Sequence, residues 1–144
     1  MDPTVEREVI VPAPPERVWE QLTDPRHLRH WLAPAVEFDP HPGGRVHVRW
    51  ADGAVRQGAV ERVDPRREVV FRWGGAGGPG GAGTSEVTFR ITAVPEGTRL
   101  VVTERGLVPT LAGVLGASLG WSLLGRRLVR GVCRPAGGAR AGRG

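Results

Sequence analysis

Among the residues that could perform chemistry, one carboxylate stands out by its place in an alternating segment. Glu104 falls on the same face as Leu100 and Val102, so alternation directs its side chain toward the interior or the rim of a sheet. A carboxylate inside a pocket can serve as an acid, a base or a polar anchor. In the alternative interpretation, which we favour from sequence, the strand ends at Thr103 and Glu104 is solvated and paired with Arg105.

Tryptophan supplies much of the large apolar surface, with five residues in a chain of 144. Their simplest role is in the core, but a pocket for an apolar ligand is also lined mainly by such side chains. Trp73 shares a face with Val69 and Phe71, and alternation turns Trp50 inward as well. Arg72 and Gln57 are secondary polar candidates beside Glu104. The predicted apolar walls of the site are Trp31, Trp50, Phe71, Trp73, Phe89 and Trp121.

Other chemistry-bearing patterns are incomplete. His27 and His30 could share a helical face, but no third metal ligand follows at a suitable spacing. Cys133 has no histidine close in sequence, and the glycine tract at 74–83 lacks the Lys-Ser/Thr of a phosphate-binding loop. The sequence therefore predicts no metal site, no cofactor and no catalytic nucleophile.

The elements that must position these residues begin with a strand and two short helices. Residues 5–11 alternate as a strand, and helices are expected at about 14–22 and 25–32. Pro14 and Pro15 suit a first helical turn, where a missing N–H costs nothing. Thr23 or Asp24 can cap the second helix, with Pro25 at its first position.

A series of strands joined by tight turns follows. They are expected to begin near residue 37 and to lie at about 45–50, 55–63, 69–73, 87–91 and 100–104. This pattern predicts an antiparallel meander and an α+β fold. Residues 109–130 are the long helix candidate, rich in glycine and dependent on packing against the sheet. We expect one domain over residues 1–132 and a disordered Arg/Gly-rich tail over 133–144.

The net charge of +5 is distributed unevenly along the chain. All acidic residues lie at or before Glu104, and the last quarter of the chain has arginine as its only charged residue. Lysine, asparagine and tyrosine are absent, which indicates GC-rich bacterial codon usage, and no aromatic residues interleave the tail arginines. We therefore expect no nucleic-acid binding.

One cysteine and no signal-peptide pattern predict a cytoplasmic protein. A membrane anchor at 107–125 is the alternative. Its proline and glycines, and the sheet face that it would leave uncovered, argue against a membrane span.

Several short motifs together resemble the START/SRPBCC superfamily with its helix-grip fold, and within it the branch of AHSA-like proteins, named after the activator of heat-shock-protein ATPase. The matching segments lie at 14–19, 22–25, 29–31, 42–45, 58–61, 70–73, 97–100 and 120–121. The resemblance implies about seven antiparallel strands curved around a long C-terminal helix, with two short helices between the first two strands. It also implies a cavity for lipids, polyketides or other hydrophobic molecules.

The first functional hypothesis is binding of a hydrophobic or aromatic small molecule between the sheet and residues 109–130. The second is a chaperone-assisting or regulatory module that binds a protein partner, as the family name suggests. A polyketide cyclase-like or hydrolase-like enzyme ranks third, because it requires a paired acid and base and the sequence offers only Glu104.

Overall fold

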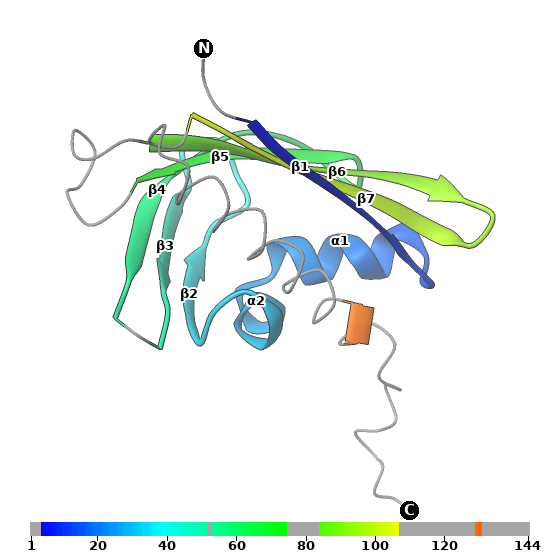
Figure 1. Ribbon diagram of the computed structural model, residues 1–144, viewed down its shortest axis with the longest axis horizontal. Coiled ribbons are helices and arrows are strands. Elements are labelled where there is room, and N and C mark those ends of the chain that lie inside the picture. The colour runs from blue at the N-terminus through cyan, green and yellow to red at the C-terminus, as the bar shows by residue number, and fades with distance from the viewer. Residues whose placement is uncertain (1–3, 52, 75–83, 107–128, 131–144) are drawn as a thin grey trace, which may run out of the picture.

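The computed structural model describes residues 4–51, 53–74, 84–106 and 129–130. Within these ranges seven strands form one antiparallel sheet that curves over two helices (Figure 1). The helices are α1 (Pro15–Thr23) and α2 (Pro25–Trp31). The strands are β1 (Thr4–Val11), β2 (Ala35–Phe38), β3 (Arg45–Arg49), β4 (Val55–Asp64), β5 (Glu68–Gly74), β6 (Thr84–Val94) and β7 (Gly97–Arg105).

The strand order is β1-β7-β6-β5-β4-β3-β2, which places β5 at the centre and β1 and β2 at the edges. The predicted α+β class, the meander and the helix pair between the first two strands are confirmed. Of the predicted helix at 109–130, only Val129 and Arg130 are described; they are helical, and Val129 packs against the core. The predicted hairpin tip, beyond Gly74, and the tail at 133–144 lie outside the described residues.

Both helix starts follow the expected chemistry. Pro15 is the first residue of α1, and Glu16 lies in its first turn. Of the two predicted candidates, Thr23 and Asp24, it is Asp24 that forms the N-cap of α2, and it accepts a 2.9 Å hydrogen bond from the Arg26 backbone N–H. Side-chain hydrogen bonding from Arg26, at 2.8 Å, lowers the pKa of Asp24 to about 2.

The core lies between the inner face of the sheet and the helices. Val69, Phe71 and Trp73 alternate into it as predicted, while Val18 and Leu22 approach from α1. Val70 points to the other face and is nevertheless buried, beside its cross-strand neighbours Arg62 and Thr88. No helix in the described ranges combines the length and apolar character needed to span a membrane.

A β-bulge interrupts the pairing of β4 with β5. Val60 lies opposite Phe71 and Arg62 lies opposite Val70, which leaves Glu61 as the extra residue. Because of this residue, Val60 and Val63 both pack against the core although they are three positions apart.

Candidate binding site

A continuous row of aromatic rings crosses the inner face of the sheet. Phe71 is its centre, with ring centroids 5.2 Å from Trp73, 5.5 Å from Phe89 and 5.5 Å from Phe38. The row extends at one end to Trp31, 6.1 Å from Phe89, and at the other to Trp50, 5.9 Å from Trp73. Tilted and edge-to-face contacts of this kind are the arrangements that aromatic rings prefer. The sheet and α2 thus bring together five of the predicted apolar side chains, Trp31, Trp50, Phe71, Trp73 and Phe89.

The sixth, Trp121, lies outside the described residues. Trp50 is only partly buried, because it follows the last residue of β3. Its exposed edge places that end of the row near the surface.

Glu104 is buried at the Trp50–Trp73 end of the row, with 1% of the residue exposed. The favoured expectation of a solvated Glu104 paired with Arg105 was therefore wrong, since β7 continues to Arg105 and keeps the inward alternation. Glu104 Oε2 accepts hydrogen bonds from Trp73 Nε1 at 2.8 Å and from Arg56 at 2.7 Å. These donors replace part of the hydration that a carboxylate loses on burial.

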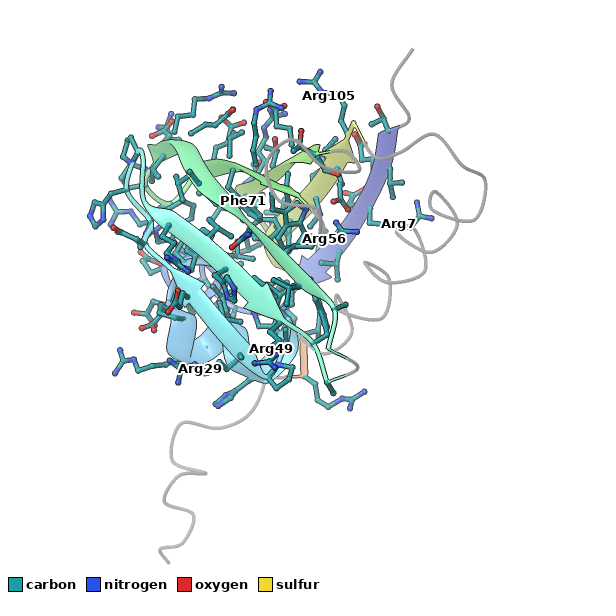
Figure 2. The ribbon with its side chains drawn as sticks, turned by 90° about the vertical axis from the view of Figure 1, so that its left-hand side faces the viewer. Arg7, Arg29, Arg49, Arg56, Phe71 and Arg105 are labelled. Atoms are coloured by element: carbon teal, nitrogen blue, oxygen red, sulfur yellow. The ribbon has the colours of Figure 1, made fainter. Side chains whose placement is uncertain are left out.

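Arg56 comes from β4 and completes this polar group. Its guanidinium carbon lies 5.1 Å from the centroid of the Trp73 ring, and its side chain is 31% exposed. Such an arrangement adds a cation–π contact to the ion pair with Glu104. Sequence reasoning missed Arg56, which is labelled in Figure 2. Alternation along β4 places it on the same face as Gly58 and Val60.

The close approach of β4 to β5 near Arg56 depends on Gly58, two residues further along β4. Gly58 pairs directly with Trp73, and a Cβ atom there would lie 1.9 Å from the carbonyl oxygen of Arg72. The absence of a side chain at Gly58 therefore lets β4 lie against β5 beside the indole of Trp73.

Two more indole N–H groups bind backbone oxygens at the ends of the helices. Trp31 Nε1 donates to the carbonyl of Gln21 at 2.7 Å, in the last turn of α1. Trp50 Nε1 donates to the carbonyl of Leu32 at 3.1 Å, the C-cap of α2. These bonds satisfy carbonyls that a helix end leaves without an intrahelical partner. They also couple the position of the aromatic row to the two helices.

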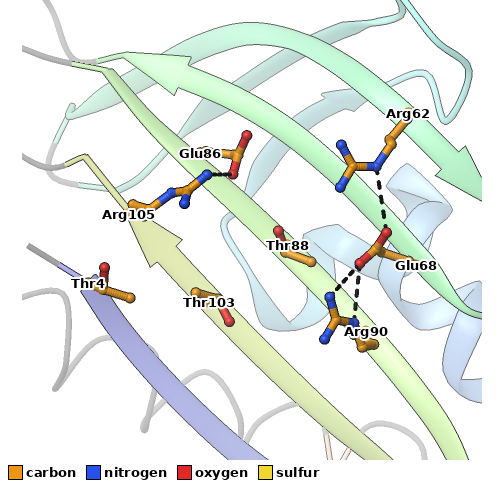
Figure 3. A pocket seen from close by; sticks show the side chains of 8 residues that line it. All are labelled: Thr4, Arg62, Glu68, Glu86, Thr88, Arg90, Thr103 and Arg105. Carbon is orange, nitrogen blue, oxygen red and sulfur yellow. Dashed lines mark hydrogen bonds and ion pairs between the residues drawn. The ribbon is translucent and has the colours of Figure 1, made fainter. Parts of the chain in front are cut away.

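The opposite, outer face of the sheet carries ion pairs around a polar hollow of about 320 Å³ (Figure 3). Glu68 binds Arg62 and Arg90, and Glu86 binds Arg105 at 2.6 Å. Arg72 also belongs to this face, where it pairs with Glu61 and Glu86.

Arg72 and Gln57 are therefore not polar groups of the inner site. Arg72 alternates with Phe71 and Trp73 and so points outward, and Gln57 is exposed. Arg56, rather than either of these two candidates, is a polar partner of Glu104 on the inner face.

The histidines are not arranged as metal ligands in the described part of the chain. His27 Nδ1 lies 3.2 Å from the side-chain amide of Gln21, and His30 is exposed. Across the described ranges no three His, Cys, Asp or Glu side chains gather in a way that could hold a metal ion.

A curved antiparallel sheet over a helix pair, with an aromatic inner face and a buried polar group, defines a helix-grip protein of the START/SRPBCC class. Residues 12–132 match the family model described as activator of Hsp90 ATPase homolog 1-like protein. The chain belongs to this family.

Solved structures share this fold. Protein MLL2253 from Mesorhizobium loti is 30% identical, with a TM-score of 0.84 over 92% of this chain and 98% of that one. DynU16, a protein in the dynemicin biosynthetic locus, is 31% identical with a TM-score of 0.78; the match covers 88% of this chain but 46% of DynU16. CalU16 from Micromonospora echinospora, at 21% identity and a TM-score of 0.70 over 92% and 76% of the two chains, shares the fold. No curated protein matches the sequence.

Proposed function

We propose that this protein binds a hydrophobic or aromatic small molecule at the inner face of its sheet. The ligand would lie against the end of the aromatic row formed by Trp50 and Trp73, with Arg56 and Glu104 as its polar contacts. Trp31, Phe71, Phe89 and Trp121 would complete the apolar walls. The protein would act in the cytoplasm, with residues 1–132 as the binding domain; the family match, which ends at 132, supports this division.

The buried Glu104–Arg56 pair carries the proposal. Replacing a buried ion pair by apolar side chains of similar volume is often neutral or stabilising. Apolar side chains packed at this place beside the aromatic rings could therefore stabilise the fold as well as the ion pair does. A few placed polar groups among apolar walls are, in contrast, what a small-molecule site uses to orient its ligand.

The first test is native mass spectrometry of the purified protein beside a denatured control. We expect a discrete additional mass in the native spectrum that disappears on denaturation. A clean apo mass, unchanged after incubation with a panel of lipids and aromatic molecules, would contradict the proposal.

Two conservative substitutions distinguish a binding role from a core role. Trp73→Phe removes the indole N–H that reaches Glu104 and keeps an aromatic ring, whereas Trp19→Phe makes the same change at a partly buried position on α1. We expect Trp73→Phe to weaken ligand binding more than Trp19→Phe at matched stability. Equal losses of binding that follow the loss of stability would indicate plain core roles for both.

A protein-interaction function is the second candidate, favoured by the description of the matched family, activator of Hsp90 ATPase homolog 1-like protein. Stimulation of a chaperone ATPase by the apo protein would support it. Insensitivity of that stimulation to Arg56→Gln would separate it from the small-molecule site.

A cyclase-like enzyme ranks below both candidates. An arginine side chain does not exchange its proton in general acid–base catalysis, so a glutamate–arginine pair supplies one proton-transfer group rather than two.

A further inference from the structure

Arg56 lies where the buried aromatic row reaches the surface. Its side chain is 31% exposed, whereas that of Glu104 is 2% exposed. The guanidinium is fixed from two sides, by Glu104 Oε2 at 2.7 Å and by the Trp73 ring at 5.1 Å. Its position is therefore defined before any ligand arrives.

Among the residues that the structure describes, Glu104 alone accepts a hydrogen bond from this guanidinium. Arginine carries five N–H donors in a planar fork. One nitrogen of Arg56 binds Glu104, and the structure shows no other hydrogen bond from this side chain to the residues it describes. A molecule lying against Trp50 and Trp73 can therefore place an acceptor oxygen on the remaining donors.

The charge of the pair limits which oxygen is favourable. Glu104 already neutralises Arg56, and it does so with almost no access to water. A ligand carboxylate would put a second negative charge on the same guanidinium, close to a buried carboxylate. A carbonyl oxygen can accept the same hydrogen bonds without that repulsion.

We propose that Arg56 selects aromatic ligands with a neutral acceptor oxygen, a conjugated ketone or quinone, over aromatic carboxylates of the same size. The proposal rests on the proposed function of the inner face. It assigns Glu104 the role of holding Arg56 in place and setting the charge preference.

Three probes of nearly equal size test this selectivity: 2-acetylnaphthalene, 2-naphthoate and 2-ethylnaphthalene. Dissociation constants are measured by calorimetry, and binding near the site is followed through the Trp73 indole N–H signal in NMR spectra. Because a hydrogen bond to a charged group is stronger than a neutral one, we expect the ketone to bind about tenfold more tightly than the other two.

Substitutions at Glu104 and Arg56 separate the effect of charge on probe affinity from the effect of the shape of the site. In Glu104→Gln the amide still accepts the bonds of Trp73 and Arg56 but leaves the guanidinium charge unbalanced, so we expect the carboxylate to gain about tenfold in affinity. In the double variant Arg56→Gln/Glu104→Gln, which leaves no unpaired buried charge, the three probes should bind within about threefold of one another. Arg90→Gln, on the outer face, is the matched control and should leave the wild-type order unchanged.

Each result decides one of the two proposals. Equal binding of the three probes to the wild type, or tighter binding of 2-naphthoate, overturns the role of Arg56 while small-molecule binding stands. No binding of any probe, together with a clean apo mass, overturns the proposed function and this inference with it. Retention of the wild-type preference in the double variant also overturns the role of Arg56.

Discussion

Glu104 and Arg56 differ in how much water each can reach, and this difference sets the cost of separating them. The carboxylate is buried, whereas the guanidinium is partly exposed. Loss of the guanidinium leaves a buried charge with less compensation, and loss of the carboxylate leaves a cation that water can still solvate.

We therefore expect Arg56→Ala to lower the free energy of unfolding by about 3 kcal/mol. The measurement is urea denaturation of the variant and the wild type at neutral pH. Arg90→Ala removes an exposed partner of Glu68 and should cost less than about 1 kcal/mol. Equal costs for the two variants would mean that burial of Glu104 does not determine the energetics of the pair.

Asp24 allows a prediction of pH dependence. Its pKa falls from 3.8 to about 2 in the folded protein, chiefly through the side-chain hydrogen bond of Arg26. A carboxyl with a lowered pKa stabilises the fold above its unfolded pKa, and that stability is lost as the pH falls through the folded pKa. The contribution should therefore be complete above about pH 5 and should decline toward pH 2.

Asp24→Ala should cost about 1 kcal/mol at neutral pH, and the difference from the wild type should shrink as the pH falls toward 2. Denaturant titrations at several pH values measure it. Asp24→Asn, which retains a side-chain oxygen to cap α2, is the control and should lose less at neutral pH. A pH-independent difference for Asp24→Ala would contradict the assignment of the lowered pKa.

At the scale of elements, the pairing of β4 with β5 depends on Gly58. Alanine at this position would bring its Cβ to 1.9 Å from a backbone oxygen, so the strands must separate. We expect Gly58→Ala to destabilise the protein by about 2 kcal/mol or more and to broaden the Trp73 indole signal. Ala59→Ser, one residue further on the exposed side, should change stability by less than about 0.5 kcal/mol.

The strands and helices could be predicted because local patterns specify them. Alternation predicted the inward face of β5, and proline and aspartate chemistry predicted where α1 and α2 begin. The Glu104–Arg56 pair could not be predicted in this way, since its members are 48 residues apart and meet only through the curvature of the sheet. No periodicity along the chain carries that information.

The bulge at Glu61 was missed for a related reason. Val55–Asp64 keeps a strand-like composition throughout, and the interruption shows only when the strand is paired with Val69 and Val70. Phe71, Trp73 and Trp50, which alternation predicted to point inward, do lie together. Arg72, between two inward residues of β5, points outward and belongs to the surface.

For the whole molecule, strand order predicts where the fold is most resistant to opening. β5 has neighbours on both sides and lies at the centre of the sheet, whereas β2 is a four-residue edge strand. Amide protons at Val69–Trp73 should exchange most slowly and those of β2 among the fastest in the sheet. Hydrogen exchange followed by NMR measures this order, and rapid exchange at Phe71 would contradict it.

The bulge has a consequence for changes in chain length. Every residue of a regular strand fixes which face its successors present, so removing one residue normally exchanges the two faces. Glu61 is the exception on β4, because its removal would join Val60 to Arg62 in the register that they already have with β5. Deletion of Glu61 should therefore cost little beyond its ion pair with Arg72, while deletion of Ala59 should turn Arg56 and Gly58 outward and prevent folding. Loss of the codon for Glu61 during evolution would therefore leave the inner and outer faces of β4 as they are, with the aromatic row still covered.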